Sequence, residues 1–374
     1  MRECYSIDMI QKEFQRGFNM KIIAVGDVSL GREIPQSLRS HSFPDHLIQK
    51  MKGVDIVFCN LECPLTSSLE RQKNHYSKIL GNSCEVFLKS DPENCRYLHD
   101  LNINLVSLGN NHILDYGNAG LYETIEVLDL NKIRHIGANK NLNSAKPIII
   151  HKEGLRIGFI GYSFTYEATE KTPGCIPLRP KRIIQDIKNL KKQCDFVFLS
   201  LHFGEEFSNY ASKKEISFCH SFIDAGASVI LGHHPHVLRG IENYHNGIIA
   251  YSLGNFIFDS HLYELKENPH LKENTQESIF LEFVIKKDTE ISLKIFPVYI
   301  DANGLPSCPD AGKSQEIMNK INNLNKALTN PRIKNFNLVN SIQKLKILIS
   351  IIFKSIITGN FQNLYLLLIR FVEG

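Results

Sequence analysis

The stretch 228–236, Ser-Val-Ile-Leu-Gly-His-His-Pro-His, joins a short apolar run to three histidines, His233, His234 and His236. The apolar run is typical of a buried parallel strand, and Pro235 keeps the histidine segment out of a regular helix. Imidazole is a common metal ligand, and open α/β sheets place their sites at the carboxyl ends of strands. The stretch therefore predicts a metal-binding loop; a histidine-rich surface loop without a site is the alternative.

Polar residues follow other apolar runs in the same way. They are Asp27 after 21–25, Glu62 after 55–59, Asn111, His112 and Asp115 after 105–108, His202 and Glu205 after 195–201, and Asn255 after 248–252. Each one alone has a structural alternative, such as a helix cap for Asp27 or a turn former for Asn111. A mostly parallel sheet would gather them all at one edge, which favours a single site.

The combined carboxylate, carboxamide and imidazole groups are a ligand set for Zn, Mn or Fe, as one ion or as a pair. We expect six residues to hold the metal: Asp27, Glu62, Asn111, His202, His234 and His236. A divalent metal is thus the expected cofactor.

Alternating strands and helices must position these residues. Further strands are expected at 155–160, 279–287 and 291–298, the last two as an antiparallel hairpin, and helices at 92–101, 180–192 and 212–224. Another helix, capped by Asn118, should follow the run 105–108. This alternation predicts an α/β fold.

Composition excludes several classes of protein. The 374 residues carry a net charge of +4 and no Trp, so nothing indicates a nucleic-acid surface. The nine cysteines are odd in number and form no Cys-x-x-Cys pair, which favours reduced thiols in the cytoplasm. Cys59 and Cys63 are interpreted as small buried residues. Residues 1–20 lack the apolar core of a signal peptide or membrane anchor.

The pattern changes to helices after residue 308, at 314–328, 338–357 and 361–371. We therefore expect an N-terminal extension at 1–20, a main domain at 21–308 and a helical segment at 309–374. The apolar part of 338–371 is interrupted by Lys346 and Lys354. It could pack on the main domain or a partner, or lie on a membrane surface, placing the protein peripherally at the inner face.

Taken in order, the motifs resemble those of the CapA family of poly-γ-glutamate capsule synthesis proteins. They are Gly26-Asp27 with Leu30-Gly31-Arg32, Asn60-Leu61-Glu62, Asn110-Asn111-His112 with Asp115-Tyr116-Gly117, His202-Phe203-Gly204-Glu205, Gly232-His233-His234-Pro235-His236 and Tyr251-Ser252-Leu253-Gly254-Asn255-Phe256. The resemblance covers about 21–306 and implies a calcineurin-like metallophosphoesterase fold, a four-layer α/β sandwich. It also implies a role in making or exporting an anionic polymer.

Two positions depart from the metallophosphoesterase pattern. Ser29 stands where an Asp-x-His motif has its histidine, and Glu62 stands where a bridging Asp is usual. His233 could compensate for the missing imidazole.

Two functions remain open. The first is metal-assisted hydrolysis of a phosphoester or γ-glutamyl amide, with His112 protonating the leaving group, Asp115 and Glu205 orienting imidazoles, and Arg32 holding an anionic substrate. His233 and Asn255 would support the site. The second is a non-catalytic assembly or export factor that binds the anionic polymer, its precursor or capsule synthase subunits.

Overall fold

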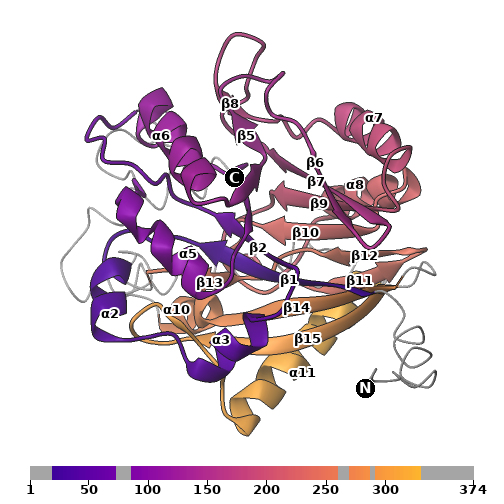
Figure 1. The fold of residues 1–374 in the computed structure, drawn as a ribbon. Helices are drawn as coiled ribbons and strands as arrows, with labels where there is room; N and C mark the ends of the chain where they lie inside the picture. Colours follow the sequence, from indigo (N-terminus) through magenta and orange to yellow (C-terminus); the bar gives the residue numbers. More distant parts are fainter. Residues whose placement is uncertain (1–18, 73–85, 260–268, 287–290, 330–374) are drawn as a thin grey trace, which may run out of the picture.

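The computed structural model describes residues 19–72, 86–259, 269–286 and 291–329. Within these ranges two large β-sheets face each other, and helices cover their outer faces (Figure 1). Three apolar clusters lie between successive layers: helix against sheet, sheet against sheet, and sheet against helix. The predicted four-layer α/β sandwich is confirmed.

The first sheet has the strand order β16-β15-β14-β1-β2-β3-β4, and β13 also pairs with β1. Strands β1 to β4 and β13 are parallel, whereas β14, β15 and β16 continue the sheet antiparallel. The bounds are β1 (Asn19–Val28), β2 (Ile56–Leu61), β3 (Leu105–Ser107), β4 (Arg134–Ile136), β13 (Asn255–Ile257), β14 (Glu277–Lys286), β15 (Ile291–Ile300) and β16 (Pro306–Ser307).

The second sheet has the order β11-β12-β10-β9-β7-β6. Its central strands are parallel and its two edge strands antiparallel. The bounds are β6 (Ile148–Lys152), β7 (Leu155–Ser163), β9 (Phe196–His202), β10 (Val229–His233), β11 (Ile241–Tyr244) and β12 (Gly247–Ala250). A separate two-stranded ladder joins β5 (Ala138–Asn139) to β8 (Gly174–Cys175).

Helices on the outer side of the first sheet are α2 (Ile34–Ser40), α3 (Asp45–Met51), the 3₁₀ helix η1 (Pro92–Cys95), α5 (Arg96–Asp100) and α6 (Gly117–Leu130). Those on the outer side of the second sheet are α7 (Pro180–Lys191) and α8 (Lys213–Asp224). Two further helices are α10 (Pro269–Gln276) and α11 (Ala311–Thr329). The hairpin β14–β15 separates α10 from α11 along the chain.

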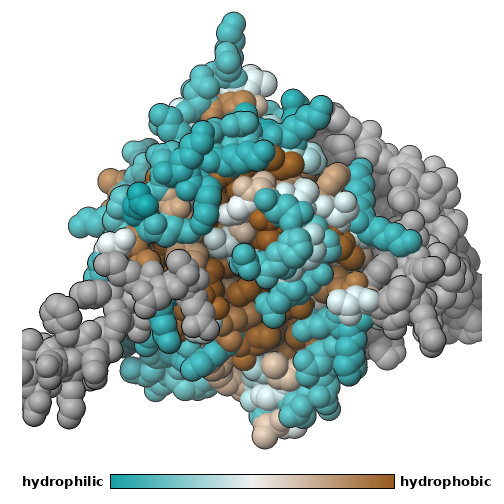
Figure 2. All heavy atoms as spheres, turned by 90° about the vertical axis from the view of Figure 1, so that its right-hand side faces the viewer, coloured by the Kyte–Doolittle hydropathy of each residue, from teal (hydrophilic) through white to brown (hydrophobic). Residues whose placement is uncertain are grey.

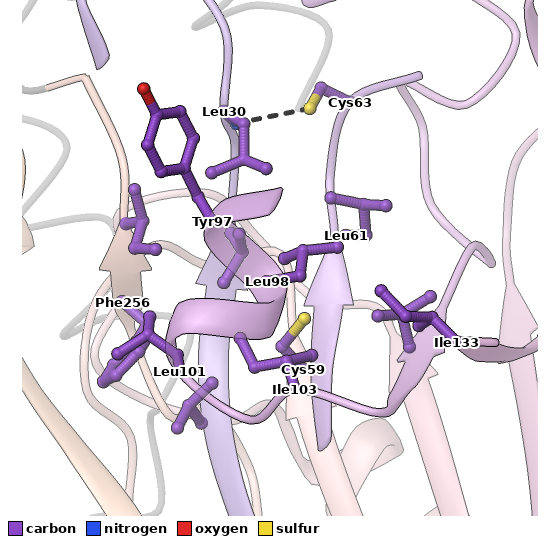
Figure 3. Close-up of a cluster of buried hydrophobic side chains, with 14 of the residues drawn as sticks. Leu30, Cys59, Leu61, Cys63, Tyr97, Leu98, Leu101, Ile103, Ile133 and Phe256 are labelled. Atoms are coloured by element: carbon purple, nitrogen blue, oxygen red, sulfur yellow. Dashed lines mark hydrogen bonds between the residues drawn. The ribbon is translucent and has the colours of Figure 1, made fainter. Parts of the chain in front are cut away.

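The contact between α5 and the first sheet is shown in Figure 3. Leu98 and Leu101 pack with Cys59 and Leu61 of β2 and Phe256 of β13, and all five side chains are buried. Removing one such leucine side chain from water contributes about 1.5–3 kcal/mol. This packing fixes the ends of β2 and β13, which carry or adjoin the site residues Glu62 and Asn255.

The core between the sheets is rich in aromatic rings. Phe159 of β7 lies 6.4 Å from Phe58 of β2 and 5.0 Å from Phe198 of β9, measured between ring centroids. Helix α11 adds Ile317 and Ile321, one helical turn apart, to the same cluster. Figure 2 shows an apolar area ringed by hydrophilic residues on the side that lies at the right of Figure 1.

Several predicted elements differ from the observed ones. Helix α6 begins at Gly117, with Tyr116 rather than Asn118 at the cap position, because the positive φ of 65° at Gly117 turns the chain into the helix. The short elements α2, α3, β6 and β11 were not predicted. The predicted helices 338–357 and 361–371 lie outside the described residues. Within the described part, no helix combines the length and apolarity needed to cross a membrane.

Candidate metal centre

The site lies where carboxyl ends of strands from both sheets meet. In the first sheet, Asp27 of β1 is paired in register with Asn60 of β2 and Asn255 of β13. In the second sheet, His202 of β9 is paired with His233 of β10. Because β1 and β10 contact each other across the sandwich, these two rows of polar side chains face one another.

An unusual backbone aims the histidines that follow β10. His234 and His236 have φ angles of 97° and 59°, a left-handed conformation that costs a non-glycine residue about 1–3 kcal/mol. Gly232 precedes them at a point where a Cβ would lie only 2.2 Å from the Tyr251 carbonyl oxygen. The backbone N–H of His234 donates to Asp27 Oδ2 at 3.2 Å. The loop is therefore held against β1.

Two groups of buried ligand atoms form around Glu62. One joins Glu62 with His234 and His236, the other joins Glu62 with Asp27 and His202, and in each group the atoms lie within 4.8 Å of one another. Asn111 is next to them, with its Oδ1 2.8 Å from His202 Nε2. The structure thus brings together the six residues predicted to bind metal: Asp27, Glu62, Asn111, His202, His234 and His236.

The two carboxylates of this cluster differ in their electrostatic surroundings. Burial raises the pKa of Glu62 well above its ordinary value, and the negative charge of Asp27 raises it further. Burial also acts to raise the pKa of Asp27, but contacts with His233, His236 and Asn60 outweigh it and hold that pKa below its ordinary value. Two carboxylates in one dry site need a compensating positive charge.

Two histidines of the cluster are held neutral. Burial lowers the pKa of His202 well below its ordinary value, and repulsion from His234 adds to the effect. Burial lowers the pKa of His234 to about 4. Neutral imidazole is the form that binds a metal ion.

Unpartnered buried atoms test whether these residues fit a cation. Buried polar atoms nearly always have a hydrogen-bond partner, yet Glu62 Oε1 and His234 Nδ1 have none among the described residues. Both are ordinary metal-ligand atoms. The buried carboxylates, the neutral imidazoles and these unpartnered atoms fit a divalent cation.

His112 is fixed in a different way from the six. Its Nδ1 lies 2.7 Å from Asp115 Oδ2, and the same carboxylate oxygen accepts the backbone N–H of Leu88 at 2.8 Å. Asp115 therefore contacts an imidazole directly, which is the contact that its predicted orienting role would require. Its other carboxylate oxygen has no hydrogen-bond partner among the described residues.

The remaining predicted residues have different surroundings. His233 Nδ1 lies 3.1 Å from Asp27 Oδ1, and Asn255 Oδ1 lies 2.9 Å from His236 Nδ1, so both touch the cluster. Arg32 is not part of it and lines a separate pocket. The backbone carbonyl of Glu205 accepts a hydrogen bond from Arg239.

Three residues at the site were not predicted. Asn60 Nδ2 donates to Asp27 Oδ1 at 2.9 Å and to Glu62 Oε2 at 3.3 Å. Phe164, directly after β7, is 43% exposed and lies edge-on to His234 at 5.0 Å. Glu206 contributes negative charge that acts on Glu62 and His234. Phe164 and Glu206 follow strands, a signal that they share with the predicted residues, whereas Asn60 lies within β2 and has no such signal.

Comparison with known proteins gives the family. A model of the family described as bacterial capsule synthesis protein PGA_cap matches residues 21–260. The chain is 29% identical over 328 residues to the PGA biosynthesis protein CapA of Bacillus subtilis, covering 85% of this chain and 79% of that protein. It is 31% identical over 266 residues to the capsule biosynthesis protein CapA of Bacillus anthracis, covering 67% of this chain and 63% of that one.

Among solved structures, a phosphatase from Mycoplasma pneumoniae aligns with a TM-score of 0.49 and 13% identity, over 82% of this chain and all of that one. The family match covers most of the chain and includes the whole cluster from Asp27 to Asn255. The chain therefore belongs to the bacterial capsule synthesis protein family.

Proposed function

We propose that this chain is a metal-dependent hydrolase in the synthesis of a capsule or exopolymer of the poly-γ-glutamate type. Its target would be a phosphoester or a γ-glutamyl amide. The observation that carries the proposal is the buried cluster in which Glu62 belongs to two groups of ligand atoms. The family match and the names of the two Bacillus relatives support the biosynthetic role.

One or two ions of the Mn, Zn or Fe type would be held by the six residues of the cluster. Glu62 would take part in holding the metal in either arrangement, because it is common to both groups of ligand atoms. A divalent cation bound there supplies Lewis-acid polarisation of a phosphoryl or carbonyl oxygen and activation of water. The low-dielectric surroundings strengthen each of these interactions.

His112 would deliver the proton to the leaving group. Its Nδ1 is hydrogen-bonded to Asp115, so Nε2 is the atom that would hold and release the proton. Asp115 in turn is fixed by the Leu88 N–H. This chain of contacts keeps the imidazole in one orientation, which a positioned acid requires.

A non-catalytic role is favoured by one feature of Asp27. Its Oδ1 already accepts a hydrogen bond from Asn60 and contacts His233, and its Oδ2 accepts the His234 N–H. A carboxylate so fully engaged with protein groups could serve the fold alone. In that case the chain would bind the anionic polymer, its precursor or capsule synthase subunits as an assembly factor.

Metal content distinguishes the two functions. We expect protein purified from cells supplied with Mn, Zn or Fe to hold at least one ion per chain by plasma mass spectrometry. His234→Ala should lose most of it while keeping its far-UV circular dichroism, because a loop ligand contributes little core packing. The matched control is His220→Ala, because His220 lies on α8 and pairs with Glu242 of β11, outside the cluster.

Activity is then measured on the metal-loaded protein with a panel of phosphoesters and γ-glutamyl peptides. Hydrolysis that His234→Ala abolishes would support the enzyme. A wild-type chain that holds no ion under any supplement would overturn it in favour of the assembly factor.

A further inference from the structure

A pocket of about 430 Å³ shares no lining residue with the metal cluster and reaches Tyr116, the residue that follows Asp115. Its walls come from the loop after β1, the end of the loop after β2, the segment before η1 and the start of α6. The residues that matter for its chemistry are Gly31, Arg32, Arg71, Phe87, Lys89 and Tyr116.

Three cations from three segments of the chain line this pocket: Arg32, Arg71 and Lys89. No carboxylate of the described residues forms a salt bridge with any of them. Asp91 is the acidic member of the lining, so the pocket keeps a net positive charge. Unpaired cations around a cavity attract an anion.

Aromatic rings hold two of these cations in place. The Arg71 guanidinium lies over the Phe87 ring, 5.1 Å from its centroid, and the Lys89 ammonium lies 5.2 Å from the centroid of Tyr116. Lys89 also donates to the carbonyl of Ser68 at 3.0 Å. Cation–π contacts restrict a long side chain while leaving N–H donors available to a ligand.

Close backbone contacts fix the spacing of the walls. At Gly31 a Cβ would lie 2.2 Å from the Lys89 carbonyl oxygen, so only glycine allows the two segments to meet. Ser90 Oγ donates to the Leu30 carbonyl at 2.6 Å. The Leu30 N–H in turn contacts Cys63 Sγ at 3.3 Å (Figure 3).

Two of the lining residues, Lys89 and Tyr116, are next in the chain to residues of the site, and Cys63 links Leu30 to Glu62. Cys63 follows Glu62 in the chain, and Tyr116 follows Asp115, the partner of His112. Lys89 follows Leu88, whose N–H donates to that same Asp115 carboxylate. The pocket is thus connected through the chain to Asp115, and a ligand group bound there would lie on the side of His112.

We propose that Arg32, Arg71 and Lys89 form a subsite for a carboxylate or phosphate group of the anionic ligand handled at the metal cluster. Guanidinium groups bind either anion through paired N–H donors, and the ammonium adds a point charge. The assignment of this ligand to the cluster rests on the proposed function. The binding of an anion does not, because it requires no metal.

The test uses the full chain stripped of metal, with calorimetric titration of two probes, a γ-linked glutamate trimer and tripolyphosphate. We expect the wild type to bind at least one of them, and the preferred probe identifies the anion as carboxylate or phosphate. Arg32→Gln and Arg71→Gln should each weaken binding about tenfold or more, the usual effect of losing a charged hydrogen bond. Lys181→Gln, on α7 over the other sheet, is the matched control for loss of charge and should bind as the wild type does.

His234→Ala should also retain probe binding. This variant separates the two proposals: lost metal or hydrolysis with intact probe binding overturns only the proposed function. The subsite is overturned if the wild type binds neither probe, or if the Arg32→Gln and Arg71→Gln variants, shown to be folded by circular dichroism, bind as tightly as Lys181→Gln.

Discussion

Asn111 and His112 are neighbours in the chain but have different partners. Asn111 Oδ1 lies 2.8 Å from His202, a candidate metal ligand, whereas His112 Nδ1 lies 2.7 Å from Asp115. Adjacent residues in a loop rarely both reach one ion. The contacts therefore support assigning metal binding to Asn111 and proton delivery to His112.

His112→Asn should keep the metal and slow turnover by about 10²–10⁴-fold, the usual contribution of a positioned acid. The loss should be smaller for an activated phenol leaving group, because a stable phenolate departs without a proton. Metal content and rates on good and poor leaving groups are measured side by side. Loss of metal, or equal slowing on both substrates, would contradict the assignment.

Asn60 illustrates what the sequence cannot reveal about single residues. It contacts Asp27, Glu62 and His202, but it lies inside an apolar strand, where one amide has no distinguishing pattern. Glu62 was predictable because it follows the strand, at the position where parallel sheets expose their sites. The partner of a polar residue depends on which strands become neighbours, and that is decided by the whole fold.

At the scale of elements, Arg239 joins the loop after β9 to α8. Its side chain is fully buried and bonds the carbonyls of Ser208 and Glu205 and the carboxylate of Glu215 at 2.7, 3.0 and 3.1 Å. Glu215 also completes the capping box at the start of α8 with Ser212. One guanidinium thus satisfies groups from both elements.

Arg239→Met should lower the free energy of unfolding by about 3–5 kcal/mol, because it leaves a partly buried carboxylate and two carbonyls without their donor. Arg156→Gln is the matched control, since Arg156 pairs with Asp195 at the surface, with its side chain 46% exposed. The Arg156→Gln substitution should lower the free energy of unfolding by less than about 1 kcal/mol. Urea unfolding of both variants gives the comparison, and similar losses would contradict the special role of Arg239.

Elements with a clear hydrophobic pattern were predictable from the sequence, whereas short elements were not. The run 228–231 and the hairpin 279–298 have uninterrupted or alternating apolar residues, and β10, β14 and β15 occur there. Strand β11 has the sequence Ile-Glu-Asn-Tyr, which carries no such signal. It is a strand because β12 offers it an antiparallel partner, which is tertiary context rather than local preference.

For the molecule as a whole, Glu277 ties α11 to the first sheet. Its carboxylate lies between the ammonium groups of Lys313 and Lys320 of α11 and forms a salt bridge with each. Burial acts to raise its pKa, but the positive charge of Lys320 and hydrogen bonds from both lysines outweigh it and hold the pKa below its ordinary value. A carboxylate with a lowered pKa stabilises the fold above the pKa of the unfolded chain and loses this effect as the pH falls.

Glu277→Gln should therefore lower the free energy of unfolding at pH 7 by about 1 kcal/mol, allowing for partial screening by solvent. The difference from the wild type should shrink as the pH falls from about 5 to about 3, through the range where glutamate is protonated. Thermal unfolding of both proteins at several pH values measures it. A difference that is constant with pH would show that packing, not charge, accounts for it.

The cationic pocket was predictable only in part. Arg32 stands in a motif and was expected to hold an anion. Arg71 comes from a polar stretch and Lys89 follows the short apolar run 86–88, and neither segment has a regular period. Their meeting depends on the close approach of Gly31 to Lys89, which only the folded chain reveals. When residues from loops far apart in the chain meet in one pocket, no local sequence pattern indicates it.

The ligand atoms of the cluster come from both sheets, and this couples ion binding to the docking of one sheet on the other. A cation bound at the cluster would stabilise the packing of the two sheets against each other. By thermodynamic linkage, that packing would increase the affinity for the cation by the same free energy. Loosening the aromatic core around Phe58, Phe159 and Phe198 would thus weaken ion affinity without touching a ligand. In such a partly open state the chain would release a cation bound at the cluster while both sheets still kept their hydrogen-bond ladders.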